Sequence, residues 1–288
     1  PEISFALRDV IFDQRANRWQ DVAYDLDNSC TRELSDDFLC TPPTGGAPTL
    51  DGDMGEDNSV GRELFSVLVG FDPSFETMMQ TRMAGGRTIV LRVTGWNGMD
   101  DDPRVDVSIG QAVGLERPDA ETTPQWDGDD TWNIADTSFV SGDPARPLIR
   151  DDNAYISGRQ LVMSMPDRQR MVMPWANGEL FTLLLTDAKW TGFINADATR
   201  MEQVILSGRY AEMDIGPAFT TVGICPGSFE RGIVDAEIRE DLDVRSRPGS
   251  GGAGIMCDAL SLGLGFTGYA STWGTPLPPP DPGPPACP

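Results

Sequence analysis

The sequence contains no histidine, and its 288 residues include a single lysine, Lys189. Without histidine the chain cannot form a Ser-His-Asp or Cys-His catalytic site, a histidine-ligated zinc site or a histidine-ligated haem. Schiff-base or Ser–Lys chemistry would have to use Lys189. These exclusions remove several large classes of enzyme before any motif is considered.

Several motifs of nucleotide-binding and metal-binding proteins are also missing. The chain has no C-x-x-C spacing, no G-x-S-x-G and no Walker A pattern. G-x-G-x-x-G occurs at 249–254 and at 263–268, but neither copy follows a convincing strand inside a βαβ unit. We therefore expect neither a bound nucleotide nor a zinc or iron–sulfur site. No apolar run approaches the ~18 residues of a membrane-spanning helix, so no transmembrane segment is expected.

Positive charge is scarce, and the formal net charge is −23. Residues 1–143 hold 28 acidic and 10 basic side chains, whereas residues 144–288 hold 17 and 12. The surplus of carboxylates is therefore concentrated in the N-terminal half. A negative field of this size repels nucleic acid and anionic membranes and attracts cations, so nucleic acid is excluded as a partner.

Five cysteines, at positions 30, 40, 225, 257 and 287, predict disulfides and an oxidising compartment. We expect Cys30 to pair with Cys40 and Cys225 with Cys257, although the sequence alone leaves the connectivity open. Cys287 would then stay free or bridge to another chain through the proline-rich tail. The chain begins at Pro1 rather than at a methionine, which suggests the processed form of an exported protein.

The patterns of apolar residues predict a β-rich fold with a few short helices. Alternation in 104–110 places Val105, Val107 and Ile109 on one face of a strand. Further strands are expected over 2–13, 87–96, 154–166 (a hairpin), 180–197 (two strands) and 202–213, and helices over 59–71, 72–84, 228–241 and the first part of 255–270. We expect an antiparallel sandwich-like core, lectin-like or jelly-roll-like, with short helices at its periphery. It would form one domain over 1–275, with a division near 144–153 as the alternative, followed by a Pro-rich tail over 276–288.

Acidic loops with glycines are the first candidate site. The stretch "LDGDMGEDNSVG" at 50–61 crowds oxygen-bearing side chains onto a turn, which suits Ca²⁺. It departs from the EF-hand, because Arg62 stands where the bidentate glutamate belongs. A further cluster lies at 100–102. We expect several loops to converge on Ca²⁺, and the alternative is a set of solvated turns. The candidate ligands are Asp25, Asp27, Asp51, Asp53, Asp57, Asn58, Asp127 and Asp129.

Tryptophans beside these loops form the second candidate site. Trp96, Trp126 and Trp132 stand in or next to acidic loops, and a ring of this kind can stack on a sugar whose hydroxyls bind carboxylates. The alternative is that the rings fold back as lids on the core. Paired carboxylates could also hydrolyse a glycosidic bond without histidine, but no spacing singles out a pair.

A few longer phrases carry a resemblance to known proteins. They include "YDLDNSCT", "DGDMGEDN", "VTGWNGMDDDPRVDVSI", "WDGDDTW" and "CDALSLGLGF". The chain resembles a group of uncharacterised exported proteins and lipoproteins of myxobacteria and related bacteria. The resemblance implies an extracellular, periplasmic or outer-surface location in a bacterium and implies no activity.

The function expected from these observations is that of an exported, non-enzymatic binding or structural protein of the cell surface or envelope, stabilised by Ca²⁺. Its partner would be a glycan or a protein. The alternatives are a carboxylate-based, glycan-active hydrolase and an accessory subunit of a larger envelope assembly that uses Cys287 and the tail as contacts.

Overall fold

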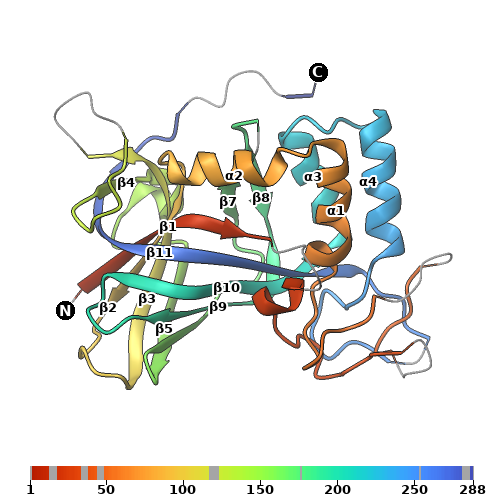
Figure 1. The fold of residues 1–288 in the computed structure, drawn as a ribbon, viewed down its shortest axis with the longest axis horizontal. Coiled ribbons are helices and arrows are strands. Elements are labelled where there is room, and N and C mark those ends of the chain that lie inside the picture. Colours follow the sequence, from red (N-terminus) through yellow and green to blue (C-terminus); the bar gives the residue numbers. More distant parts are fainter. Residues whose placement is uncertain are drawn as a thin grey trace.

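A closed β-barrel forms the centre of the molecule (Figure 1). The computed structural model describes residues 2–12, 18–33, 38–43, 49–116, 123–175, 177–252, 254–280 and 286–287. Each barrel strand is antiparallel to its neighbours, the strands follow the order of the sequence around the wall, and the last pairs with the first. The eight strands are β1 (Glu2–Ile11), β2 (Ile89–Thr94), β3 (Asp102–Leu115), β5 (Ile149–Ser157), β6 (Gln160–Ser164), β9 (Leu185–Ile194), β10 (Arg200–Ala211) and β11 (Ala259–Leu277).

Closure of the sheet corrects the predicted architecture. The chain is mainly β, with antiparallel strands and a few short helices, as expected. The predicted sandwich or jelly roll is wrong, because β1 pairs with β11 from Ser4 opposite Ser271 to Ile11 opposite Gly265. The strands therefore form one closed wall instead of two stacked sheets. A sandwich and a barrel both need alternating inward apolar residues, so the local pattern does not distinguish them.

Side chains fill the barrel interior. Val105, Val107 and Ile109 of β3 are all buried in the main core, as their alternation predicted. The rings of Trp190 on β9 and Phe266 on β11 belong to the same core, with centroids 5.4 Å apart. This filling is expected, because an eight-stranded barrel has an interior of about the size that side chains occupy.

Helices and a hairpin extend this core on one side of the barrel (Figure 1). The predicted helices over 59–71, 72–84 and 228–241 are present, and α3 was not predicted. The ring of Trp175 stacks on Phe181 with centroids 4.7 Å apart and meets Phe75 of α2 edge-on at 4.9 Å. The elements are η2 (Val60–Leu64), α1 (Phe65–Phe71), α2 (Phe75–Ala84), β7 (Met171–Pro174), β8 (Leu180–Leu183), α3 (Glu212–Thr221) and α4 (Phe229–Glu240). None of the helices in the described ranges has the length and hydrophobicity needed to cross a bilayer.

A short strand covers part of the outer wall. β4 (Thr131–Ala135) pairs antiparallel with the end of β3 and parallel with the end of β11. Its side chains Trp132 and Ile134 pack on Ala6 and Val90, which face outward from β1 and β2. The single-turn helices η3 (Asp136–Ser138) and η4 (Val140–Gly142) follow it. No strand was predicted over β4, which is only five residues long.

The longest strand replaces a predicted helix. The first part of 255–270 was expected to be helical, but β11 is extended over 19 residues. Gly263 and Gly265 bring it close to η1 (Arg18–Val22): a Cβ at Gly263 would lie 2.3 Å from the carbonyl oxygen of Val22. The second G-x-G-x-x-G therefore serves close packing within a strand, and no helix follows it to bind a phosphate.

The disulfides differ from the predicted pairs. Cys40 pairs with Cys257 and Cys225 with Cys287, with Cα atoms 5.1 and 5.4 Å apart, whereas Cys30 is a free, exposed thiol. The predicted pairs joined cysteines that are close in sequence, whereas Cys40 and Cys257 are 217 positions apart. Cys287 is therefore neither free nor bridged to another chain, contrary to the prediction. Residues 281–285 and 288 of the Pro-rich tail lie outside the described residues.

Candidate functional site

Three of the predicted metal ligands converge at one end of the barrel. Oxygen atoms of Asp25, Asp27 and Asp57 all lie within 4.8 Å of one another. We call these three residues the acidic cluster. They come together because Tyr24 forms an antiparallel bridge to Asp57, which aligns the segment after η1 with the segment before η2. Asp57 is buried, Asp27 is partly buried and Asp25 is exposed, so the cluster opens to solvent through Asp25.

Backbone N–H groups stabilise each of these carboxylates. Asp57 Oδ2 accepts a hydrogen bond of 2.7 Å from the N–H of Leu26. Asp25 and Asp27 accept hydrogen bonds of 2.6 and 2.8 Å from the N–H groups of Asn28 and Ser29. These short-range bonds fold residues 24–29 into a turn that directs the carboxylates toward one another.

Two further carboxylates lie behind the cluster. Asp51, from the loop at 50–61, accepts hydrogen bonds from the N–H and hydroxyl of Thr31 at 2.5 and 2.7 Å. Asp243 accepts from the N–H of Ser261 at 2.8 Å and from its hydroxyl. Because Ser261 lies on β11 and its hydroxyl also accepts from the N–H of Ser59, this network fixes the loop to the barrel.

Crowding raises the affinity of these carboxylates for protons. Burial is the largest cause of the raised pKa of Asp57, and the charges of Asp243, Asp27 and Asp51 raise it further. Burial likewise raises the pKa of Asp27 to about 6 and that of Asp243 to about 7. Without a bound metal ion the cluster therefore holds at least one proton near neutral pH, and this proton offsets part of the negative charge of the carboxylates.

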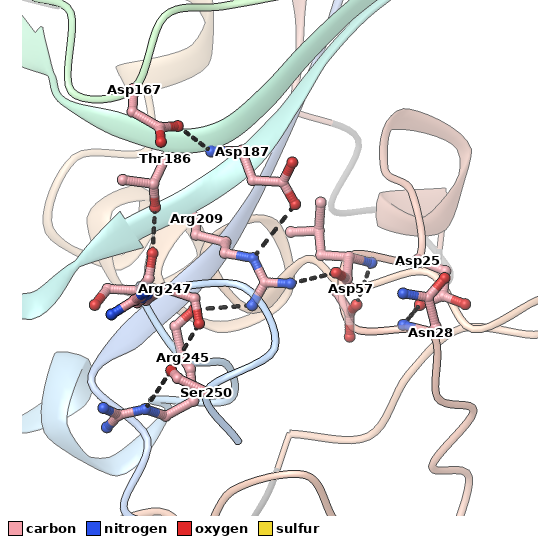
Figure 2. Close-up of polar contacts among 12 residues, drawn as sticks. Asp25, Asn28, Asp57, Asp167, Thr186, Asp187, Arg209, Arg245, Arg247 and Ser250 are labelled. Atoms are coloured by element: carbon pink, nitrogen blue, oxygen red, sulfur yellow. Dashed lines mark hydrogen bonds and ion pairs between the residues drawn. The ribbon is translucent and has the colours of Figure 1, made fainter.

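Arg209 supplies positive charge beside the cluster. Figure 2 shows its guanidinium between Asp187 and Asp57. Its Nη1 donates to the carbonyl oxygen of Arg245 at 2.8 Å, its Nη2 donates to that of Leu26, and its Nε lies 3.8 Å from Asp187. The side chain is buried, and its charge lowers the pKa of Asp27. Arg209 thus joins the N-terminal segment, β10 and the segment after α4.

The acidic cluster brings together three carboxylates that could hold a metal ion. Ca²⁺ binds six to eight oxygens at 2.3–2.6 Å, so ligands on opposite sides of the ion are about 5 Å apart. The carboxylate oxygens of the acidic cluster lie within 4.8 Å of one another, which is compatible with that distance. Carboxylates that otherwise hold a proton also match a divalent cation, which would replace the proton as the neutralising charge.

A polar groove adjoins the cluster on the outer wall of the barrel. Two cavities of about 450 and 290 Å³ share Leu26, Asn28 and Asp187 in their linings. The larger is also lined by Gln160 and Thr191, and the hydroxyl of Tyr24 lies 2.5 Å from that of Thr191. The lining further includes Asp25, Lys189 and Ser207 in the larger cavity, and Asp27 and Arg209 in the smaller.

One hydroxyl in the groove is left without a partner. Ser207 is fully buried, and its Oγ makes no hydrogen bond to the rest of the described chain. It lies directly opposite Lys189 in the pairing of β10 with β9. A buried hydroxyl without a partner costs free energy.

The other predicted metal ligands lie outside the cluster. Asp53 is exposed, and its nearest cation is Arg32 at 3.9 Å. Asp127 and Asp129 form an exposed turn in which Asp127 accepts from the N–H of Asp129. Asn58 is buried and serves the fold, because its amide bonds Trp19 and Gly263 and its oxygen accepts from Gly61 N–H at the start of η2.

The tryptophans do not form a ligand platform. Trp132 is fully buried and Trp96 is nearly so, and the indole N–H of Trp96 donates to Met99. Trp126 packs against Trp132 with centroids 5.2 Å apart and donates to Ala84. Trp96 and Trp132 are buried in the core and cannot stack on a sugar, whereas Trp126 keeps part of its ring surface exposed.

Sequence reasoning missed Arg209, Asp243 and the groove. Arg209 carries a local signal, since it stands in the apolar strand "VILSGRYA" where a charged residue needs a reason. Asp243 and the groove carry none, because both depend on contacts between distant segments. The chain matches no protein-family model, and no curated protein or solved structure matches it.

Proposed function

We propose that the protein is an exported, non-enzymatic binding protein in which Ca²⁺, held by the acidic cluster, shapes the polar groove. The convergence of Asp25, Asp27 and Asp57 carries the proposal. Asp25 and Leu26 line the groove, so an ion that orders residues 24–29 also orders one of its walls. The two disulfides support export, because such bonds persist mainly in oxidising compartments.

The chemistry of the groove favours a ligand rich in hydroxyl groups, such as a glycan. Gln160 and Thr191 offer neutral donors and acceptors, and Ser207 offers an unused one. Tyr24 supplies an aromatic ring at the same wall. Side chains of this kind bind hydroxyl groups without requiring charge on the ligand.

Thermal unfolding with and without Ca²⁺ tests the metal. Ca²⁺ at about one hundred times its dissociation constant should stabilise the chelator-treated protein by about 2.7 kcal/mol, or roughly 5–10 °C in Tm. Asp57→Asn keeps an acceptor for Leu26 N–H and imitates the protonated carboxyl, so it should fold normally and lose the Ca²⁺ shift. Asp53→Asn, in the same loop, should keep the shift. A wild-type Tm that Ca²⁺ leaves unchanged, with no calcium found by elemental analysis, contradicts the proposal.

A glycan panel tests the groove. A binder should show ligand-dependent increases in Tm that Ser207→Val reduces, with no change in the glycan. The second candidate, a carboxylate-based hydrolase, rests on Asp25 and Asp187, which line the same cavity. That alternative predicts released reducing ends, and loss of their release in Asp187→Asn. Release by the wild type would replace the binding proposal with the enzymatic one.

A further inference from the structure

A second cavity lies on the side of the barrel that the helices and the β7–β8 hairpin cover. It has a volume of about 330 Å³ and lies between the end of β3, the hairpin and the end of α3. Ala112, Val113 and Leu180 form apolar parts of its wall. Its polar lining consists of Arg87, Gln111, Arg170, Glu179, Thr182 and Thr221. We call this space the arginine cavity.

Arg170 is the unusual group in this cavity. It precedes β7, is exposed to solvent and also lines an adjoining space of about 30 Å³. It makes no hydrogen bond or ion pair with the described part of the chain. Partial burial lowers its pKa. Among the described residues, the chain thus places a guanidinium at the junction of two spaces without a hydrogen-bonded or ion-paired partner.

Two more arginines gather at Gly178, which lines the same cavity. Arg87 Nη1 donates to the carbonyl oxygen of Gly178 at 2.5 Å. The guanidinium of Arg82 lies flat on this residue, with its three nearest atoms 3.4–3.6 Å from the position of a Cβ at Gly178. Neither forms an ion pair in the described ranges, and Glu179 in the same wall pairs with none of the arginines. Positive charge therefore accumulates here in a protein whose net charge is −23.

The neighbouring Arg168 shows what the chain does when it neutralises a guanidinium. Two residues before Arg170, it forms a bidentate pair with Asp214 at 2.5 and 2.8 Å. Arg170 has no such partner among the described residues, although carboxylates outnumber bases two to one in this sequence. The side chains of Gln111 and Thr182 in the cavity also make no hydrogen bond among the described residues. The charged and the neutral donors are both available to a ligand.

We propose that the arginine cavity binds a small organic anion, with its carboxylate or phosphate group on Arg170 and Arg87 and its apolar body against Ala112, Val113 and Leu180. The planar fork of arginine matches both oxyanions, which share this chemistry. A volume of about 330 Å³ accommodates a ligand with one small ring or a short chain. The site is distinct from the acidic cluster and requires no metal.

Calorimetric titration with benzoate, phenyl phosphate and inorganic phosphate tests this site. We expect saturable binding of one molecule of an organic anion per chain, and the preferred probe distinguishes a carboxylate from a phosphate site. Arg170→Gln should weaken binding about tenfold or more while leaving Tm nearly unchanged, because Arg170 makes no hydrogen bond or ion pair with the described residues. Arg170→Lys keeps the positive charge but loses the planar guanidinium, so its affinity should lie between those of the wild type and Arg170→Gln. Arg247→Gln, the matched control, removes an exposed arginine near the acidic cluster and should bind like the wild type.

The outcomes separate this site from general attraction and from the proposed Ca²⁺ site. Equal affinities for the wild type and Arg170→Gln would overturn the proposal, as would the absence of heat with all three probes. Binding that Arg247→Gln weakens as much as Arg170→Gln would show diffuse charge attraction only. The titration is repeated in chelator and with Asp57→Asn, where an unchanged affinity is expected. Failure of the Ca²⁺ tests would then leave this result intact.

Discussion

The acidic cluster and the arginine cavity concentrate charge of opposite sign, and the chain stabilises the two regions differently. At the acidic cluster every carboxylate accepts a backbone N–H, and Arg209 lies alongside. At the arginine cavity the guanidinium of Arg87 donates to one backbone carbonyl oxygen, and Arg170 has no hydrogen-bond or ion-pair partner in the described chain. Backbone hydrogen bonds hold the carboxylates of the acidic cluster in position toward one another, whereas no hydrogen bond within the described chain holds the guanidinium of Arg170.

The largest expected effect comes from breaking the disulfide beside the acidic cluster. Cys40–Cys257 ties the N-terminal segment to the segment before β11, and Cys40 lines the smaller cavity of the groove. The double variant Cys40→Ala/Cys257→Ala should lose roughly 2–5 kcal/mol in unfolding free energy, because a long loop of the unfolded chain is released. It should also lose the Ca²⁺ shift while still binding organic anions at the arginine cavity.

The free thiol Cys30 provides the control for that experiment. Cys30→Ala should change the free energy of unfolding by less than about 0.5 kcal/mol, since the residue is exposed and unpaired. Urea unfolding measures both variants. If the double variant loses no more unfolding free energy than Cys30→Ala, neither the acidic cluster nor the arginine cavity depends on the Cys40–Cys257 disulfide.

Local patterns predicted most strands but could not predict how they close. The alternation in β3 and the turn between β5 and β6 are properties of a few consecutive residues, and both were read from the sequence. The pairing of Ser4 with Ser271 joins the two ends of the chain, and no local pattern records it. Helix α3 was missed because Gly216 and Pro217 lower its helix propensity. Gly216 leaves room for Arg231, whose Nη2 would lie 2.4 Å from a Cβ there.

A matched pair of arginine substitutions sharpens the comparison. Arg209→Met should destabilise the fold by about 3 kcal/mol, because it leaves the carbonyl oxygens of Leu26 and Arg245 without donors and removes charge beside Asp27. Arg170→Met should change stability by less than about 0.5 kcal/mol, since it removes no contact. Urea unfolding in chelator measures both. Equal losses would contradict the distinction between a structural and an available guanidinium.

The candidate site was partly predictable for a similar reason. Asp25, Asp27 and Asp57 were recognised because aspartates near glycines and turns mark oxygen-rich loops. Asp127 and Asp129 share that local signature, yet they lie in another turn, so composition alone cannot show which loops meet. The arginine cavity has no sequence motif at all. Its residues come from β3, the β7–β8 hairpin and the chain beyond α2, and only the fold brings them together.

The smallest expected effect concerns Asp241, which tests whether the excess of carboxylates extends beyond the acidic cluster to the end of α4. Burial raises the pKa of Asp241 to about 7, and Glu237, Glu63, Asp243 and Glu240 raise it further. In the unfolded chain this carboxyl ionises near its ordinary value of 3.8. The folded state therefore binds the extra proton between pH 4 and 7, and stability should fall as pH rises through that window.

Asp241→Asn keeps the shape of the side chain but cannot ionise, so its stability should fall less steeply with pH. After allowance for solvent screening at this partly exposed position, the difference between wild type and variant should reach about 1 kcal/mol by pH 8. The measurement is urea unfolding in chelator at pH 5, 6, 7 and 8, with Asp53→Asn as the exposed control. Parallel pH profiles for the wild type and Asp241→Asn would confine the charge imbalance to the acidic cluster itself. A flatter pH profile for Asp241→Asn than for the wild type would show that the excess of negative charge extends to the end of α4.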